Sequence, residues 1–182
     1  SVSLEWARDT NVRVISGRLK GRRLRSPDGG QVRPTSDRVR ETLFDILGYR
    51  VDGARVLDAC AGTGALGIEA LSRGAANVVF VEAHSGAASL LAKNLAHCEL
   101  EAQAVVLVDS LPRAASRAEL SEPFDLILLD PPYDAPEIGT ILSAIAPRLR
   151  RGGILVLERS KRASILDTAT LVVVRTVKAG DS

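Results

Sequence analysis

Short apolar runs alternate with longer segments of mixed polarity along most of this chain. The apolar runs predict five buried strands, at Arg55–Asp58, Asn77–Glu82, Ala104–Val108, Phe124–Leu129 and Gly153–Glu158. The segments between them predict helices at Ala65–Ser72, Ser85–Ala96, Pro112–Leu120 and Glu137–Leu149. Because strands and helices alternate, we expect an α/β fold, with a mostly parallel twisted sheet and helices on both of its faces. Further along, the pattern predicts a short helix at Arg162–Asp167 and a last strand at Leu171–Val177.

The first fifty residues follow a different pattern. Val12–Ser16 alternates as a strand does, and Gly17 and Gly21 then punctuate a basic stretch, which predicts a small basic β-hairpin. A helix should begin after Arg33-Pro34-Thr35-Ser36, because an extended residue precedes the proline and hydroxyl side chains follow it. The residues expected on its apolar face are Val39, Leu43, Ile46 and Leu47, with Phe44 beside them, and Gly48 should end the helix.

These patterns divide the chain into two parts of one domain, since 182 residues are too few for two comfortable ones. Residues 1–50 would form a basic arm, the hairpin and a covering helix, and residues 51–182 the α/β core. Charge follows this division, because residues 1–40 hold ten Lys or Arg against four Asp or Glu. Such segregation favours a nucleic acid as a partner over the alternative of a solvated charged face. The candidate RNA contacts are Arg13, Arg18, Lys20, Arg22, Arg23, Arg25, Arg33, Arg38 and Arg40.

Composition narrows the class of protein further. A hydrophobic content of 46% and a charged content of 25% are typical of a globular domain. No run of eighteen apolar residues predicts a transmembrane helix, and the first ten residues do not resemble a signal peptide. Two cysteines provide no disulfide framework, and no Cys or His cluster has metal-ligand spacing. We therefore expect a cytoplasmic monomer with no membrane partner and no metal.

A glycine-rich turn follows the first core strand. Gly62, Gly64 and Gly67 match G-x-G-x-x-G between a predicted strand and helix, and Glu82 closes the next strand. By itself this pattern equally suits a NAD-dependent oxidoreductase. Asp58 argues against that function, because a carboxylate ahead of the glycines would repel a pyrophosphate. It would attract the ammonium and sulfonium of S-adenosylmethionine (SAM).

Acidic residues also end the other strands of the predicted sheet. Glu82 is placed to accept hydrogen bonds from the ribose hydroxyls of SAM, and Asp109, with Ser110 beside it, from the adenine amino group. Each could alone be a turn residue, but four strand-end carboxylates, with Asp58 and Asp130, indicate a ligand site at one edge of the sheet. Thr35 would close over the methionine end. The candidate cofactor-binding residues are Asp58, Ala59, Gly62, Thr63, Gly64, Glu82, Asp109, Ser110 and Thr35.

The fourth core strand ends in Asp130-Pro131-Pro132-Tyr133. Because each proline fixes its own φ and cannot continue a strand ladder, the chain should leave the sheet in one rigid shape. Hydrogen bonds to Asp130 and to the carbonyl of Pro131 would aim the lone pair of an exocyclic base amine at a methyl donor. Tyr133 would provide a face for an unstacked base. The candidate catalytic residues are therefore Asp130, Pro131 and Tyr133.

Asp-Pro-Pro-Tyr after the fourth strand, together with the Gly62 turn, resembles the class I amino-methyltransferases that modify bases in DNA and RNA. The resemblance sharpens over Arg33–Phe44, Gly64–Ala75 and the basic segment Val12–Leu24, which together are similar to the bacterial RsmD family. It implies a Rossmann-like class I methyltransferase fold. It also implies a SAM-dependent enzyme that methylates N2 of a guanine in 16S ribosomal RNA of the small subunit.

Two other functions remain open on the residues alone. A DNA adenine-N6 or cytosine-N4 methyltransferase would use Asp-Pro-Pro-Tyr equally well, although so short a chain shows no extra domain for reading DNA sequence. A non-catalytic RNA-binding domain would need only the basic amino terminus.

Overall fold

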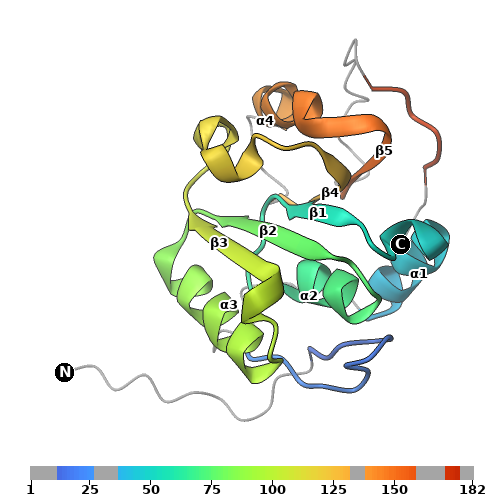
Figure 1. The fold of residues 1–182 in the computed structure, drawn as a ribbon, viewed down its shortest axis with the longest axis vertical. Helices are drawn as coiled ribbons and strands as arrows, with labels where there is room; N and C mark the ends of the chain where they lie inside the picture. Colours follow the sequence, from blue (N-terminus) through green and yellow to red (C-terminus); the bar gives the residue numbers. More distant parts are fainter. Residues whose placement is uncertain (1–11, 27–36, 132–137, 159–170, 177–182) are drawn as a thin grey trace, which may run out of the picture.

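The computed structural model describes residues 12–26, 37–131, 138–158 and 171–176. Its centre is a parallel five-stranded sheet with the order β3-β2-β1-β4-β5 (Figure 1). The strands are β1 (Arg55–Asp58), β2 (Asn77–Glu82), β3 (Ala104–Val108), β4 (Phe124–Leu129) and β5 (Leu149–Leu157). The chain builds outward from β1 to β3 and then returns to β4 on the other side of β1. At such a reversal, α/β sheets bind ligands in a crevice at the carboxyl ends of the two strands that diverge, here β1 and β4.

The strands place alternate side chains on two apolar layers, one on each face of the sheet. Val56 and Val78 pack in the layer that contains α2, α3 and the N-terminal part of the chain. Leu57 and Val79 pack in the layer that contains α4. Figure 1 shows α2 and α3 on one side of the sheet and α4 on the other. The helices are α1 (Asp37–Leu47), α2 (Ala65–Ser72), α3 (Ser85–His97) and α4 (Ile138–Ile145).

The predicted α/β fold with a parallel sheet is confirmed, but two connecting elements differ from the prediction. The expected helix Pro112–Leu120 is two 3₁₀ turns, η3 (Arg113–Ser116) and η4 (Ala118–Leu120), because Arg117 between them is extended, at φ −70° and ψ 145°. The expected helix 137–149 ends at Ile145 and continues as the 3₁₀ turn η5 (Ala146–Arg148). Pro147 lies in that turn and has no N–H for an α-helical hydrogen bond.

The sheet also differs from the prediction toward its C-terminal end. β5 begins at Leu149 rather than at Gly153. Residues 171–176 form no strand, although the sequence predicts one, and the side chains of Val172, Val173 and Val174 are 88%, 65% and 91% exposed. β-Branched residues favour strands only where a neighbouring strand pairs with them, which explains the error. The helix predicted at 162–167 lies outside the described residues.

The basic segment, defined as residues 12–26, folds back on itself but does not form two strands. A single antiparallel bridge joins Arg13 and Arg23, and the Val14 N–H donates to the Arg22 carbonyl at 2.9 Å. The predicted β-hairpin is therefore not confirmed as a strand pair. The segment packs against α2 and α3 and shares their apolar layer. The division at residue 50 stays a prediction.

The buried face of α1 matches its predicted apolar face only in part. Its buried side chains are Arg40, Phe44 and Leu47, whereas the side chain of Ile46 is 37% exposed. Arg40 adds a charged side chain to the buried face, where it forms an ion pair with the buried side chain of Glu69. After α1, the chain continues as the 3₁₀ turn η1 (Gly48–Val51). No helix among the described residues is long and apolar enough to cross a membrane.

Candidate active site

The glycine turn lies between the carboxyl ends of the two strands that flank β1. The Ala59 N–H donates to the Leu128 carbonyl of β4 at 2.8 Å, and the Ala61 N–H donates to the Val81 carbonyl of β2 at 3.0 Å. The Gly64 N–H closes the turn on the Ala61 carbonyl at 2.7 Å. The turn is thus suspended over the ends of the three central strands.

The three glycines of the turn have different surroundings. Gly64 adopts a φ of +83°, and a Cβ there would lie 2.2 Å from Cδ1 of Leu91. A Cβ on Gly67 would lie 2.2 Å from Cε1 of Phe80, so both glycines allow close packing within the protein. A Cβ on Gly62, at φ +54°, would meet nothing within 4 Å. The backbone at Gly62 therefore faces open space at the sheet edge, where a ligand can approach it.

Two buried carboxylates hold this turn in place. Oε2 of Glu82 accepts the Gly62 N–H at 2.7 Å, and Oε1 accepts the His84 N–H at 2.8 Å. Oδ2 of Asp58 accepts the Gly67 N–H at 2.9 Å in the first turn of α2. Because each carboxylate oxygen has a second lone pair, both side chains can still accept a hydrogen bond from a ligand.

Negative charge is concentrated at this edge of the sheet. Burial, and then the nearby charges of Asp130 and Glu82, raise the pKa of Asp58 to about 7, although the Gly67 N–H opposes this effect. Burial and the same three carboxylates raise the pKa of the Cys60 thiol to about 12. The predicted gathering of strand-end acids therefore occurs for Asp58, Glu82 and Asp130. A cation placed among them would favour their ionised forms.

Asp109 follows β3 at the next position along the edge. Its N–H donates to the Glu82 carbonyl at 3.1 Å, and its side chain accepts hydrogen bonds from Arg113 at 2.6 Å and from the Ser110 N–H at 2.8 Å. The Arg113 hydrogen bond is the main reason that the pKa of Asp109 lies below its usual range. Sequence reasoning missed Arg113, although its spacing of four residues from an acid is a recognisable signal.

The structure brings most of the predicted cofactor-binding residues to one edge. Those near the turn are Asp58, Ala59, Gly62, Thr63, Gly64 and Glu82, with Asp109 and Ser110 at the end of the adjacent strand. Asp130 and Pro131 are half-buried at the end of β4. Tyr133, Thr35 and Arg33 lie outside the described residues, so their roles stay predictions.

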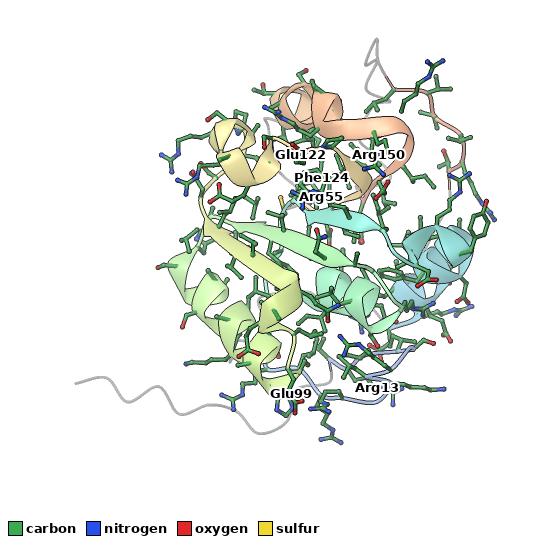
Figure 2. The ribbon with its side chains drawn as sticks, viewed as in Figure 1. Arg13, Arg55, Glu99, Glu122, Phe124 and Arg150 are labelled. Atoms are coloured by element: carbon green, nitrogen blue, oxygen red, sulfur yellow. The ribbon has the colours of Figure 1, made fainter. Side chains whose placement is uncertain are left out.

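The basic segment lies away from β5, on the side of the molecule where Figure 2 shows Arg13. The candidate RNA contacts that are exposed are Arg13, Arg18, Lys20, Arg23, Arg25 and Arg38, and Arg22 is half-buried. Arg18 donates to the Gln103 side chain, and Arg22 donates to the His97 carbonyl at 2.8 Å. Both interactions hold basic side chains against the surface near the end of α3.

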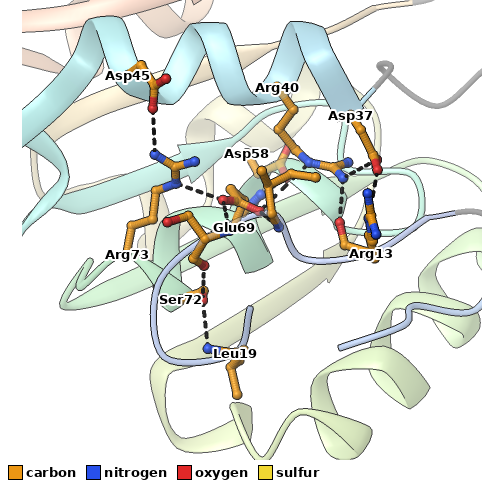
Figure 3. A network of polar contacts seen from close by, with 12 residues as sticks. Arg13, Leu19, Asp37, Arg40, Asp45, Asp58, Glu69, Ser72 and Arg73 are labelled. Atoms are coloured by element: carbon orange, nitrogen blue, oxygen red, sulfur yellow. Dashed lines mark hydrogen bonds and ion pairs between the residues drawn. The ribbon is translucent and has the colours of Figure 1, made fainter. Parts of the chain in front are cut away.

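Arg40 does not belong to this surface, and its prediction as an RNA contact is wrong. Its side chain is 0% exposed, and its guanidinium donates to the Arg13 carbonyl and, at 3.0 Å, to Asp37 (Figure 3). Burial lowers the pKa of Arg40, and the nearby charges of Glu69 and Asp37 oppose this effect. Arg40 fastens α1 to the basic segment and cannot reach a nucleic acid from there.

Sequence reasoning also missed the polar side chains of α2 and α3 that hold the basic segment. Glu69 accepts the N–H groups of Ile15 at 2.7 Å and Ser16 at 3.0 Å, and Ser72 accepts the Leu19 N–H at 3.0 Å (Figure 3). Asn94 of α3 contacts the segment farther along. A glutamate inside the otherwise apolar sequence of α2 was a signal that its partners lie within the fold.

The parallel sheet, the glycine turn and the strand-end carboxylates define a class I methyltransferase. The structure of yhhF from Escherichia coli, to which methyltransferase activity is ascribed, matches with a TM-score of 0.74 and 34% identity, over 86% of this chain and 84% of that one. RsmC from Thermus thermophilus, a 16S rRNA N2-guanine methyltransferase solved with AdoMet and guanosine, matches with a TM-score of 0.58 and 32% identity. That match covers 70% of this chain and 35% of RsmC.

The sequence model of the family described as "Conserved hypothetical protein 95" matches residues 12–182. The chain is also 39% identical to YlbH of Bacillus subtilis, to which rRNA methyltransferase activity is ascribed, over 86% of this chain and 87% of that protein. It is 40% identical to ribosomal RNA small subunit methyltransferase D of Escherichia coli K12, over 67% of this chain and 60% of that protein. The chain therefore belongs to this family, and the predicted resemblance to RsmD is confirmed.

Proposed function

We propose that this protein transfers a methyl group from SAM to N2 of a guanine in 16S ribosomal RNA of the small subunit. The observation that carries the proposal is the group of three carboxylates, Asp58, Glu82 and Asp130, around a glycine turn whose Gly62 faces open space. The similarity to ribosomal RNA small subunit methyltransferase D supports the choice of RNA, and the similarity to RsmC, a 16S rRNA N2-guanine methyltransferase, supports guanine N2.

The residues at the turn fit SAM better than a dinucleotide. A pyrophosphate would meet the negative charges of Asp58 and Asp130, whereas an ammonium and a sulfonium would be attracted by them. Glu82 keeps lone pairs for two ribose hydroxyls while it holds the Gly62 N–H. When bound, SAM supplies an electrophilic methyl group on its sulfonium. These contacts disfavour the NAD-dependent oxidoreductase that the glycine pattern alone allows.

The end of β4 would position the base. Asp130 and the carbonyl of Pro131 accept hydrogen bonds from the exocyclic amine, and this localises the nitrogen lone pair and directs it toward the cofactor crevice. The Asp130 carboxylate stabilises the positive charge that grows on the nitrogen during transfer. No strong base is needed, because the amine loses its proton after methylation has made it acidic. Tyr133 provides the stacking face for the unstacked guanine.

The basic segment would bind the RNA backbone near this crevice. Its exposed arginines and lysine neutralise phosphates without reading sequence, so they orient the RNA while Asp130 and Tyr133 select the base. The enzyme acts as a cytoplasmic monomer on the small ribosomal subunit.

The test uses small subunits from a strain that lacks methyltransferase D, incubated with the purified protein and labelled SAM. Nucleoside digestion should yield N2-methylguanosine. Asp130→Asn should lower kcat by about 100-fold or more, whereas Asp52→Asn, on the exposed turn before β1, should match the unmodified protein. Methylated adenine or cytosine in DNA would favour the DNA alternative. RNA binding without any methylation, or calorimetric binding of NAD instead of SAM, would overturn the proposal.

A further inference from the structure

Asn94 of α3 joins the basic segment to the glycine turn. Its side chain is 0% exposed. Its Nδ2 group donates to the carbonyl of Thr63 at 2.9 Å and to the carbonyl of Arg25 at 3.0 Å, and its Oδ1 atom accepts the Arg25 N–H at 2.8 Å. One buried amide therefore fixes two backbones that are 38 residues apart along the chain, Arg25 and Thr63.

The contact with Thr63 restrains the part of the turn that faces the cofactor crevice. Thr63 lies between Gly62 and Gly64, and both glycines have positive φ values. The N–H groups of these glycines are held by Glu82 and by the Ala61 carbonyl, and Asn94 holds the Thr63 carbonyl between them. Because a peptide unit is planar, holding the Thr63 carbonyl also sets the direction of the Gly64 N–H. Leu91, three residues before Asn94 on the same face of α3, packs against Gly64. The helix thus supports the turn at two adjacent points.

Other anchors of the basic segment do not reach the glycine turn directly. Ser72 donates to the Ser16 carbonyl at 2.6 Å and accepts the Leu19 N–H at 3.0 Å, both in the segment. Ser72 ends α2, at the opposite end of that helix from the turn. The two side chains therefore form a matched pair, because both hold the segment and Asn94 also holds Thr63.

We propose that Asn94 is a positioning residue that couples RNA binding by the basic segment to cofactor binding at the glycine turn. The inference rests on the proposed function, since it assigns RNA to one side of the amide and SAM to the other. RNA that stabilises the segment around Arg25 also stabilises the Thr63 carbonyl in its hydrogen-bonded position. By thermodynamic linkage, a bound cofactor then strengthens RNA binding by the same factor.

The experiment measures the affinity for unmodified small subunits with and without S-adenosylhomocysteine, the unreactive product. The unmodified protein should bind subunits about fivefold or more tightly when the product is present. The ratio of the two affinities, with and without S-adenosylhomocysteine, should fall to about one in Asn94→Leu. Asn94→Asp keeps only the acceptor for the Arg25 N–H, and the ratio should fall in this variant too. Ser72→Ala should weaken subunit binding and keep the ratio. An unchanged ratio in both Asn94 variants, or an equal loss in Ser72→Ala, overturns the inference.

Amide hydrogen exchange on the unmodified protein tests the same inference even if the Asn94 variants do not fold. Adding S-adenosylhomocysteine should slow exchange of the Arg25 N–H, which bonds to Asn94 and not to the turn itself. If bound S-adenosylhomocysteine leaves exchange of the Arg25 N–H unchanged, this inference is overturned while the proposed function stands. If calorimetry shows that the protein binds neither SAM nor S-adenosylhomocysteine, the proposed function is overturned as well.

Discussion

Replacing Asp58 by asparagine should remove much of the pH dependence of this protein's stability. Asp58 is 1% exposed, and burial beside Asp130 and Glu82 raises its pKa from 3.8 to about 7. The folded protein therefore binds more protons than the unfolded chain between about pH 4 and pH 7. Its free energy of unfolding must fall as the pH rises through this window, and the loss is complete above the folded pKa.

The size of the effect follows from the two pKa values. Their difference corresponds to about 4 kcal/mol of unfolding free energy between acidic pH and pH 8. Asparagine can keep the hydrogen bond from the Gly67 N–H, but it buries a new amide group that costs about 1–3 kcal/mol if it finds no acceptor. Absolute stability is therefore a poor measure. The difference in stability between pH 5 and pH 8 isolates the charge of Asp58.

Urea unfolding at several pH values between 5 and 8, without cofactor, measures this difference for both proteins. The unmodified protein should lose about 2–3 kcal/mol across this range, and Asp58→Asn should lose much less. SAM affinity should rise with pH over the same range in the unmodified protein, because a cation favours ionised Asp58, and should be weak in the variant. Parallel stability profiles for the two proteins would refute the reasoning.

Three further perturbations test the packing, the buried ion pairs and the RNA surface. Gly64→Ala should cost about 1–3 kcal/mol, because its Cβ would lie 2.2 Å from Leu91 Cδ1 at φ +83°; urea unfolding should show no such cost for Gly86→Ala, where a Cβ meets nothing within 4 Å. Glu69→Gln should cost about 1–3 kcal/mol, because the buried guanidinium of Arg40 would lose one of its two carboxylate partners and keep only Asp37. Thermal unfolding equal to that of the exposed control Glu101→Gln would contradict this. Raising salt should weaken RNA binding, with log K falling by about 0.7–0.9 per tenfold rise in salt for each phosphate neutralised. A flat salt titration would contradict the basic RNA surface.

Much of the core was predictable because local pattern and tertiary environment agree there. The strands at Asn77–Glu82 and Phe124–Leu129 are almost continuously apolar, and each is buried on both faces of a parallel sheet. The sequence after β1 likewise predicts the glycine turn, since glycine is the residue that adopts positive φ at low cost. The pattern failed over residues 171–176, because strand propensity does not supply a partner strand.

The candidate site was predictable in its residues and less so in their environment. Strand-end acids at Asp58, Glu82 and Asp130 could be placed at one edge from the order of elements alone, because parallel strands end at a common edge. Their mutual repulsion and the shift of the Asp58 pKa depend on burial and on separations in space, which no spacing along the chain specifies.

By itself, the sequence determined the alternation of strands and helices, the turn that glycine permits and the acids that end the strands, since these depend on residues close together along the chain. Only the tertiary structure decided which basic side chains face solvent. Arg40 looked like part of the basic surface, yet it is buried against Glu69, 29 positions away. Asn94 looked like an ordinary helix residue, yet it holds the backbones of Arg25 and Thr63. The reason is physical: a buried polar group must find its partners wherever the fold brings them, and that search is not local in sequence.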